Sequence, residues 1–237
     1  MTLLSNRPYI TVVLAMSVDG KIASGERSPA RFSSLADKNH LEQQVAGSDA
    51  VLFGAGTLRA YGTTIRVLEP QLIQQRSQQL LPPQPVQIVV SGSGNIDRQL
   101  AFFQQPIPRY LLTTSQGAQS WQNQSYFEQI IISKTSTKSK INWLKAMQKI
   151  LAMGLKRLAV LGGGEIVAAM LAADLIDELW LTVCPLVLGG NNAPTPVGGI
   201  GFTESNAPRW ELLSAKVIAS EVFLHYRRQR RGDLSTL

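Results

Sequence analysis

Residues 157–164 read RLAVLGGG and are followed by EIVAAMLAADLIDELWLTV at 165–183. An apolar strand ends in three glycines, a short helix follows, and a second apolar strand completes a βαβ unit. Glycine lets a backbone approach a ligand closely, and the first N–H groups of a helix attract an anion. The stretch therefore predicts a nucleotide or dinucleotide site at Gly162–Gly164. A glycine turn without a ligand is the alternative that this motif alone leaves open.

Strand and helix patterns alternate in both directions from this unit. Tyr9–Ser17 is apolar on both faces, as expected of a central strand covered by helices, and Asp19-Gly20 predicts a turn after it. Further strands are expected at 49–55, 86–91, 109–114 and 129–133, and helices at 35–46 and 143–153. Residues 210–219 and 221–228 predict an antiparallel hairpin, and residues 69–85, 134–140 and 191–209 predict loops.

This alternation predicts an α/β fold in which helices flank a central, largely parallel sheet. We expect one domain over residues 1–237, with its core at about 7–228 and a basic tail at 229–237. The 44% hydrophobic content is ample for a buried core. The apolar runs are too short to cross a membrane, so we expect no membrane association.

The chain carries 23 Lys and Arg against 16 Asp and Glu, a net charge of +7. Its basic residues are scattered except near the C-terminus, at Arg227, Arg228, Arg230 and Arg231. Aromatic residues that would stack on bases are not interleaved with them, so we expect no nucleic-acid partner. A non-catalytic basic module that binds nucleotides or nucleic acid remains the alternative of a different class.

Cysteine and histidine usage limits the chemistry further. Cys184 is the single cysteine and lies in an apolar stretch, and His40 and His225 are the two histidines. One cysteine forms no disulfide framework, and this spacing does not indicate a zinc site. We therefore expect no metal and a reducing, cytoplasmic setting.

Four segments together resemble a known family: RPYITVVLAMSVDGKIASG at 7–25, DAVLFGAGTLRA at 49–60, LAVLGGGEIVAAMLAADLIDELWLTVCPLVLGG at 158–190, and the closing hairpin. They look like the reductase domain of bacterial riboflavin biosynthesis. The resemblance implies a dihydrofolate-reductase-like, three-layer fold that reduces a ribosylamino-pyrimidine phosphate with NADPH. The paired H-x-E and P-C-x-x-C signature of the deaminase often fused to it is absent, which implies the reductase in stand-alone form.

The resemblance also implies a cofactor site. Its residues are Ala15 and Met16 beside the nicotinamide, Thr57 after the second strand, and Gly163, Gly164, Glu165 and Ile166 around the pyrophosphate. Backbone donors at Gly162 extend that cradle, and we expect Glu165 to cap the helix or to bind a sugar hydroxyl. Ser91, with Ser93, is our candidate for the 2′-phosphate of NADPH. The glycine pattern of a Rossmann fold is not matched, because the first strand ends in SVDGK.

Lys21 is the candidate catalytic residue, since the resemblance puts it beside substrate and cofactor. A charged amine there would hold a phosphate or deliver a proton through water. Asp19 is assigned to the substrate side, although fixing its own turn is the alternative role. The reaction needs no nucleophile or metal, only a hydride donor and an acceptor held together.

Three positions depart from the family pattern. Val45 replaces an arginine of the first helix, Tyr61 and Gly62 replace an acidic and proline-containing segment, and Leu161 replaces a glutamate before the glycines. Arg59, Arg66 and Tyr61 are the candidate substitutes for the missing substrate contacts. We therefore expect the riboflavin pyrimidine, or another pyrimidine or pteridine, as substrate. A homodimer that pairs through the apolar strand DELWLTVCPLVLG is also expected.

Overall fold

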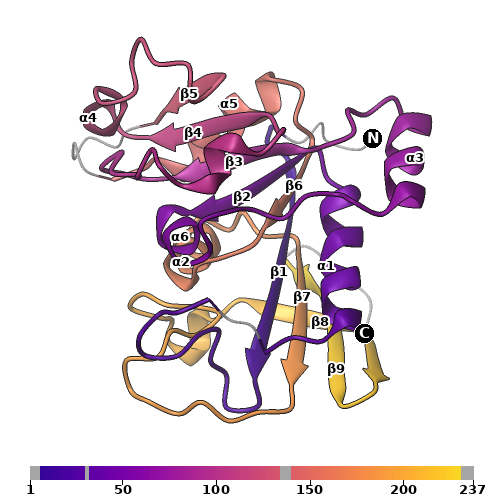
Figure 1. The fold of residues 1–237 in the computed structure, drawn as a ribbon. Helices are drawn as coiled ribbons and strands as arrows, with labels where there is room; N and C mark the ends of the chain where they lie inside the picture. The colour runs from indigo at the N-terminus through magenta and orange to yellow at the C-terminus, as the bar shows by residue number, and fades with distance from the viewer. Residues whose placement is uncertain (1–5, 30–31, 134–139, 231–237) are drawn as a thin grey trace.

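The computed structural model describes residues 6–29, 32–133 and 140–230 (Figure 1). Nine strands form one sheet in the order β5-β4-β3-β2-β6-β1-β7-β9-β8. All neighbours from β5 to β7 run parallel, and β9 and β8 add an antiparallel hairpin. The strands are β1 (Tyr9–Ser17), β2 (Ala50–Gly54), β3 (Val86–Val90), β4 (Arg109–Thr113), β5 (Gln129–Ile132), β6 (Arg157–Val160), β7 (Glu178–Cys184), β8 (Arg209–Ile218) and β9 (Glu221–Gln229).

Helices lie on both faces of this sheet. They are α1 (Leu35–Ala46), α2 (Ala55–Tyr61), α3 (Pro70–Gln78), α4 (Ser115–Ala118), α5 (Trp143–Ala152) and α6 (Gly164–Ala172), with 3₁₀ turns η1 (Ala101–Gln104) and η2 (Glu204–Asn206). One apolar cluster joins the sheet to α5 and α6. A second cluster on the opposite face joins it to α1, α2 and η1. The predicted three-layer α/β architecture, with its parallel sheet and closing hairpin, is confirmed.

Strand β6 is inserted between two strands that come early in the chain. Leu158 pairs with Ile10 of β1 on one side and with Ala50 of β2 on the other. The inserted strand is buried except at its first residue, as a central parallel strand should be. The glycines that follow β6 therefore lie at the middle of the sheet rather than at its edge.

The prediction of a loop at 69–85 is wrong, because α3 occupies its first half. Pro70 begins this helix, a position that proline tolerates, and the Glu42 carboxylate accepts hydrogen bonds from the Leu68 and Glu69 N–H groups just before it. Leu72 and Ile73 pack against the second apolar cluster, and the other residues after Pro70 are Gln, Arg and Ser. Apolar periodicity, the signal used for the other helices, is therefore missing from its sequence.

The basic tail begins later than predicted. Gln229 belongs to β9, and the Arg230 guanidinium lies 3.0 Å from Asp177 and 3.2 Å from Asp174. The predicted basic loop at 134–140 lies outside the described residues except for Lys140. No described helix has the length and apolar character needed to span a membrane.

Asp177 joins three distant parts of the chain at the amino end of β7. Its carboxylate accepts a pair of hydrogen bonds from Arg7, at 2.7 Å each, one from the Ile10 N–H group and one from Arg230. Only 7% of the Asp177 side chain is exposed. The carboxylate therefore ties the start of β1 and the end of β9 to the loop that precedes β7.

Replacing this carboxylate should remove the two hydrogen bonds that it accepts from the half-buried Arg7. We expect Asp177→Ala to lower the free energy of unfolding by about 3 kcal/mol, measured by urea denaturation. Asp174→Ala is the matched control, since Asp174 also pairs with Arg230 but is 53% exposed, and it should cost less than about 1 kcal/mol. Equal losses in the two variants would contradict the role given to Asp177.

Candidate functional site

The carboxyl ends of β1, β6 and β2 meet beside the glycine turn. The Gly54 N–H group donates to the Gly162 carbonyl at 3.1 Å, and a Cβ atom on Gly162 would lie 3.3 Å from the Leu14 side chain. After β6 the chain continues into α6, which covers one face of the sheet. After β1 and β2 it continues into α1 and α2, which cover the opposite face. Such a reversal opens a crevice at the strand ends, which is where α/β proteins bind ligands.

The glycine turn presents backbone rather than side chains to this crevice. Gly162 has φ of +104°, and the peptide bond between Gly162 and Gly163 is cis. Gly163 is the N-cap of α6, and no side chain caps the helix there. A Cβ atom on Gly163 would meet nothing within 4 Å, so the space beside it is open. Open space therefore lies beside the N-cap of α6, at the positive end of the helix dipole.

The next two residues, Gly164 and Glu165, pack against a loop. A Cβ atom on Gly164 would lie 2.4 Å from the Thr195 carbonyl oxygen, so only glycine fits. The Gly198 N–H group donates to the Gly164 carbonyl, and the Gly199 N–H group donates to the Glu165 carboxylate at 3.2 Å. Glu165 thus holds the loop at 195–199 against α6.

Asp19 holds two loops together at the same edge of the sheet. Its carboxylate accepts hydrogen bonds from the Ser17 hydroxyl at 2.6 Å, from the Leu188 N–H group at 3.0 Å and from the Gly189 N–H group at 2.7 Å. The Ser17 hydrogen bond, followed by the backbone bonds, lowers the pKa of Asp19 to about 2. These contacts give the carboxylate a positioning role in the turn after β1.

Lys21 is fixed through its backbone by the same turn. Its N–H group donates to the Ser17 hydroxyl oxygen, and its carbonyl accepts from the Ser17 N–H group, each at 2.9 Å. The next residue, Ile22, donates to the Pro194 carbonyl. The Lys21 side chain therefore starts from a rigid point at the carboxyl end of β1, between the loops after β1 and β7. None of the ion pairs among the described residues involves Lys21.

The predicted cofactor residues gather along this edge. Ala15 and Met16 are half-buried at the end of β1, Thr57 is half-buried in the first turn of α2, and Ile166 is half-buried in the first turn of α6. Gly54 pairs with Val90, so Ser91 continues β3 at the level where α2 begins. Ser91 is 7% exposed, whereas Ser93, two residues later, is exposed and its hydroxyl oxygen accepts from the Asn95 N–H group.

The predicted substrate residues do not all lie at this edge. Arg59 is exposed on α2, and its guanidinium donates to the Asn95 carbonyl at 3.5 Å, beside Ser93 rather than beside Lys21. Tyr61 ends α2 about 9 Å along the helix axis from Ala55. Arg66 lies between Thr64, which bonds Gln87, and Val67, which bonds Gln84. Gln84 precedes β3 and Gln87 is its second residue, so Arg66 is near the amino ends of the strands.

Two of the positions that depart from the family are packing positions. Val45 is fully buried in the cluster that joins α1 and α2 to the sheet, and Leu161 packs against the same cluster. A charged side chain in place of Val45 would lie in that core. The Val45 departure therefore concerns the interior of this chain and not the crevice.

Sequence patterns missed the loop at 186–199 as part of the site. The sequence predicts a connecting loop at 191–209 and places Leu188 and Gly189 in the apolar stretch expected at a dimer interface. In the structure Leu188, Gly189, Pro194 and Thr195 contact the turn after β1 or the start of α6. Its Gly, Pro and Asn content indicates a loop but carries no information about which strand end it covers. The pairing of β7 with β1 brings it there.

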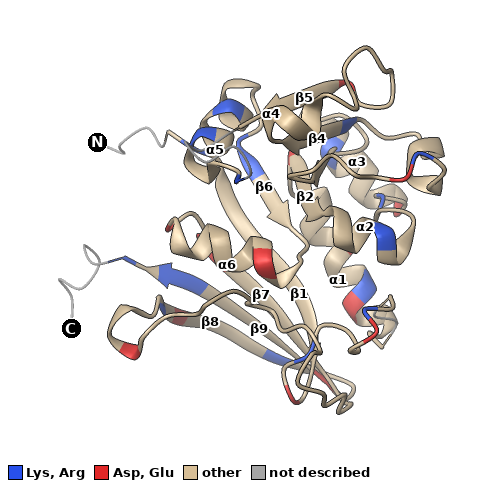
Figure 2. Cartoon of the chain, turned by 90° about the vertical axis from the view of Figure 1, so that its left-hand side faces the viewer, with Lys and Arg blue, Asp and Glu red and all other residues tan. Residues whose placement is uncertain are grey.

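The basic segment near the C-terminus is largely paired with acids in its described part. Arg227 lies 3.8 Å from Glu178, and Arg228 lies 3.3 Å from Asp174. Lys and Arg are spread over several helices and strands in Figure 2 rather than gathered on one face. No group of three or more His, Cys, Asp and Glu residues in the described part of the chain is arranged to hold a metal ion.

The fold and the glycine turn define an α/β protein in which a helix begins at a glycine turn at the carboxyl ends of the parallel strands. Comparison with known families matches residues 8–224 to the RibD C-terminal domain. The chain belongs to this family.

Relatives with curated names agree with that family. The 2,5-diamino-6-ribosylamino-4(3H)-pyrimidinone 5′-phosphate reductase of Archaeoglobus fulgidus is 26% identical over 213 residues, which cover 83% of this chain and 89% of the relative. The counterpart in Methanothermobacter thermautotrophicus is 24% identical over 221 residues, which cover 93% of this chain and 98% of the relative. Among solved structures, a pyrimidine reductase-like protein from Corynebacterium diphtheriae superposes with a TM-score of 0.78 at 22% identity, covering 95% of this chain and 93% of that one.

The Asp19 contacts predict a pH-dependent loss of order at this edge. The pKa of Asp19 is lowered from 3.8 to about 2, so its contribution to stability is complete above pH 3.8 and is lost as the pH falls toward 2. Asp19→Asn should lower the melting temperature at pH 7, and the difference from the unmodified chain should shrink between pH 4 and pH 2. Glu26→Gln, an exposed acid in the same segment, is the control. A difference that does not change with pH would contradict the contacts.

Proposed function

We propose that this protein is an NADPH-dependent reductase of riboflavin biosynthesis that transfers a hydride to a ribosylamino-pyrimidine phosphate. The observation that carries the proposal is the uncapped N-terminus of α6 beside open space at Gly163. The names of the archaeal relatives support the pyrimidine phosphate as substrate. We also propose the cytoplasm as its location, consistent with a single buried cysteine.

The residues at the strand ends fit a dinucleotide. Glycine backbone and free N–H groups at the start of α6 suit a pyrophosphate, and the half-buried Ala15 and Met16 offer an apolar surface for a nicotinamide ring. The strand ends from β1 to β3 span about 14 Å, three spacings between neighbouring strands. This row of residues suits an extended ligand that runs from Met16 past Gly163 and Thr57 to Ser93.

In this proposal the chain mainly binds and orients the reactants. Bound NADPH supplies the hydride. Backbone N–H groups at Gly163 and Gly164 hold the pyrophosphate, and Ala15 and Met16 exclude water beside the ring. Lys21, anchored by Ser17, holds the substrate phosphate or passes a proton through water to the reduced centre. Asp19 keeps Lys21 in place by fixing its turn to Leu188 and Gly189.

We assign Arg59 to the cofactor rather than to the substrate. Its guanidinium lies beside Asn95, in the loop that carries Ser91 and Ser93, and a Cβ atom on Gly56 would lie 4.0 Å from its Nη2 atom. A guanidinium and a serine hydroxyl are suitable donors for the 2′-phosphate. Arg66, near the other ends of the strands, receives no role.

The backbone at the strand ends indicates less about the substrate than about the cofactor. Leu161 offers no carboxylate to a pyrimidine ring, and Tyr61 ends α2 with 46% of its surface exposed. These side chains favour a second candidate within the same chemistry, the reduction of another pyrimidine or of a pteridine. Hydride transfer from NADPH is common to both candidates.

The proposal includes a homodimer, but its interface is not the apolar strand DELWLTVCPLVLG that the sequence analysis favours. β7 is hydrogen-bonded to β1 and to β9, so its edges are not available for pairing. β8 is one of the two outer strands of the sheet, and Leu212, Val217 and Ile218 on it are 45–75% exposed. A long apolar edge strand favours association with another chain. We therefore expect two copies to meet at β8.

The reductase activity is tested by NADPH binding and turnover. We expect NADPH to bind with a Kd below 1 mM and to be oxidised in the presence of 2,5-diamino-6-ribosylamino-4(3H)-pyrimidinone 5′-phosphate or the corresponding uracil. Dihydrofolate is the comparison substrate for the pteridine candidate. Absence of binding of both NADPH and NADP would overturn the proposal, and binding without turnover would favour a nucleotide-binding module.

The variant Arg59→Ala tests whether Arg59 binds the 2′-phosphate of NADPH. A charged hydrogen bond is worth about 1.5–3 kcal/mol, so the Kd for NADPH should rise about tenfold or more, while that for NADH should not change. Arg66→Ala is the matched control and should leave both values unchanged. An equal effect of Arg59→Ala on both cofactors would remove Arg59 from the 2′-phosphate site.

The dimer is tested by sedimentation. The 25.9 kDa chain should sediment as a dimer, and Val217→Asp should give a monomer with an unchanged circular dichroism spectrum, because a charge on the exposed edge opposes pairing. Lys216→Asp tests whether charge alone on this strand has the same effect. A monomeric unmodified chain at micromolar concentration would contradict the interface.

A further inference from the structure

The segment that joins β1 to α1 leaves the sheet and returns to it at nearly the same place (Figure 1). It starts after Ser17, the last residue of β1, and it ends at Ser34, the N-cap of α1. Ser34 contacts Glu221, where β9 begins beside the end of β7. β9 is separated from β1 by β7 alone, so the two ends of residues 18–33 lie two strand spacings apart, about 10 Å. Surface loops with such neighbouring ends are frequently functional.

A buried carboxylate lies at the neck of this loop, the place where its two ends approach each other. Glu221 is 3% exposed, and its two carboxylate oxygens accept hydrogen bonds from the Ser34 N–H group, at 2.9 Å, and from the Ser34 hydroxyl. The Ser34 hydroxyl oxygen in turn accepts from the Asp37 N–H group, which caps α1. None of the ion pairs among the described residues involves Glu221. The stability of this buried charge therefore depends on hydrogen bonds such as those from Ser34.

The same carboxylate acts on the end of β7. Cys184, the last residue of β7, is fully buried, and its pKa is raised to about 12, first by burial and then by the charges of Glu221 and Asp37. Cys184 pairs with Ser17, whose hydroxyl oxygen accepts from the Lys21 N–H group. Glu221 is therefore close to both ends of the loop, directly at one end and across β7 at the other.

The middle of the loop is held less firmly than its ends. Near its start, the Ile22 N–H group donates to the Pro194 carbonyl. Among the described residues, the hydrogen bonds of 23–29 then stay within the segment, as from the Arg27 N–H group to the Ser24 carbonyl. Arg27 itself is exposed. The position of the loop at the strand ends is therefore set mainly by its anchors.

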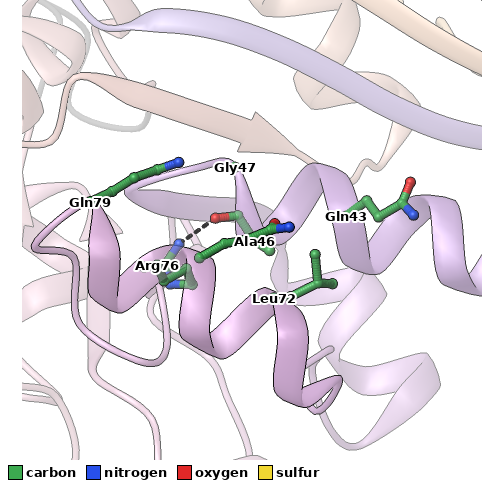
Figure 3. A pocket seen from close by; sticks show the side chains of 7 residues that line it. Gln43, Ala46, Gly47, Leu72, Arg76 and Gln79 are labelled. Atoms are coloured by element: carbon green, nitrogen blue, oxygen red, sulfur yellow. Dashed lines mark hydrogen bonds between the residues drawn. The ribbon is translucent and has the colours of Figure 1, made fainter.

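The rest of α1 has anchors of its own. At the end of the helix, the buried Arg76 donates from Nη1 to the Ala46 carbonyl at 2.7 Å (Figure 3). Farther back, the ring of His40 packs against Trp180, with 4.6 Å between the ring centroids. Loss of the contacts at Glu221 should therefore release the loop and the first turn of α1, while the remainder of the helix stays in place.

We propose that Glu221 is a positioning residue for the substrate side of the reductase site: by closing the neck of the loop at 18–33, it keeps Lys21 and the loop beside the bound pyrimidine phosphate. The inference rests on the proposed function, in which Lys21 meets the substrate. The proposed cofactor row extends from β1 toward β3, whereas Glu221 lies on the other side of β1. Its loss should therefore affect the substrate and not NADPH.

Steady-state kinetics test this separation. Glu221→Ala should raise the KM for the pyrimidine phosphate about tenfold or more, the effect of losing a charged hydrogen bond, and should leave the Kd for NADPH unchanged. Glu221→Gln keeps an acceptor for the Ser34 N–H group and should recover most of the loss. Ser34→Ala removes one of the two bonds without changing the buried acid, and it should raise the KM in the same direction.

Two further variants serve as controls. Glu211→Ala removes an exposed acid from β8 of the same hairpin and should leave the KM and the Kd unchanged. Arg76→Met loosens the other end of α1, so it should lower the melting temperature without raising the KM. This variant separates positioning of the loop from a general loss of stability.

Trypsin cleavage tests the neck of the loop without NADPH. Cleavage after Arg27 should be about tenfold faster in Glu221→Ala than in the unmodified chain and unchanged in Arg76→Met. Unchanged cleavage in Glu221→Ala, or equal effects of that variant on the KM and on the Kd for NADPH, would overturn the proposal. Absent turnover in the unmodified chain would instead count against the reductase, and the cleavage rate would still decide whether Glu221 closes the loop.

Discussion

The insertion of β6 between β1 and β2 is the constraint on which the rest of the structure depends. Two hydrogen bonds extend the pairing past the end of the strand, from Leu161 N–H to the Leu52 carbonyl and from Gly54 N–H to the Gly162 carbonyl. They bring the glycine turn to the middle of the sheet, where α2 and α6 begin on opposite faces. Without that insertion the three glycines would be a turn at a sheet edge, with no crevice beside them.

Much of the architecture follows from local sequence, because buried parallel strands are apolar on both faces and are bounded by Gly, Asp and Ser. Tyr9–Ser17, the strands at 86–91, 109–114 and 129–133 and the closing hairpin are therefore predicted within a few residues. The strand order is not, since the pairing of Leu158 with both Ile10 and Ala50 joins segments more than 100 residues apart. α3 also escapes prediction, because Leu72 and Ile73 alone give no helical periodicity, and the hydrogen bonds of Glu42 and Arg76 tie it to α1, which is distant in the sequence.

In the candidate site, too, some features follow from local sequence and others depend on tertiary contacts. Glycine at 162–164 identifies the turn from sequence because backbone conformation and close approach demand glycine, as the 2.4 Å contact at Gly164 illustrates. Arg59 and Arg66 are indistinguishable as sequence, yet one lies beside Ser93 and the other lies near the opposite ends of the strands. Side chains on loops take their position from tertiary contacts, such as those that Asp19 makes with Leu188 and Gly189.

A site built from backbone tolerates sequence change better than one built from side chains. This chain presents a glycine turn, a helix start without a side-chain cap and open space at Gly163, all of which are properties of the main chain. Recognition of a pyrimidine requires particular side-chain donors and acceptors, and Leu161 supplies neither. In the proposed reductase the cofactor would therefore depend mainly on the main chain, whereas the choice of substrate would depend on side chains.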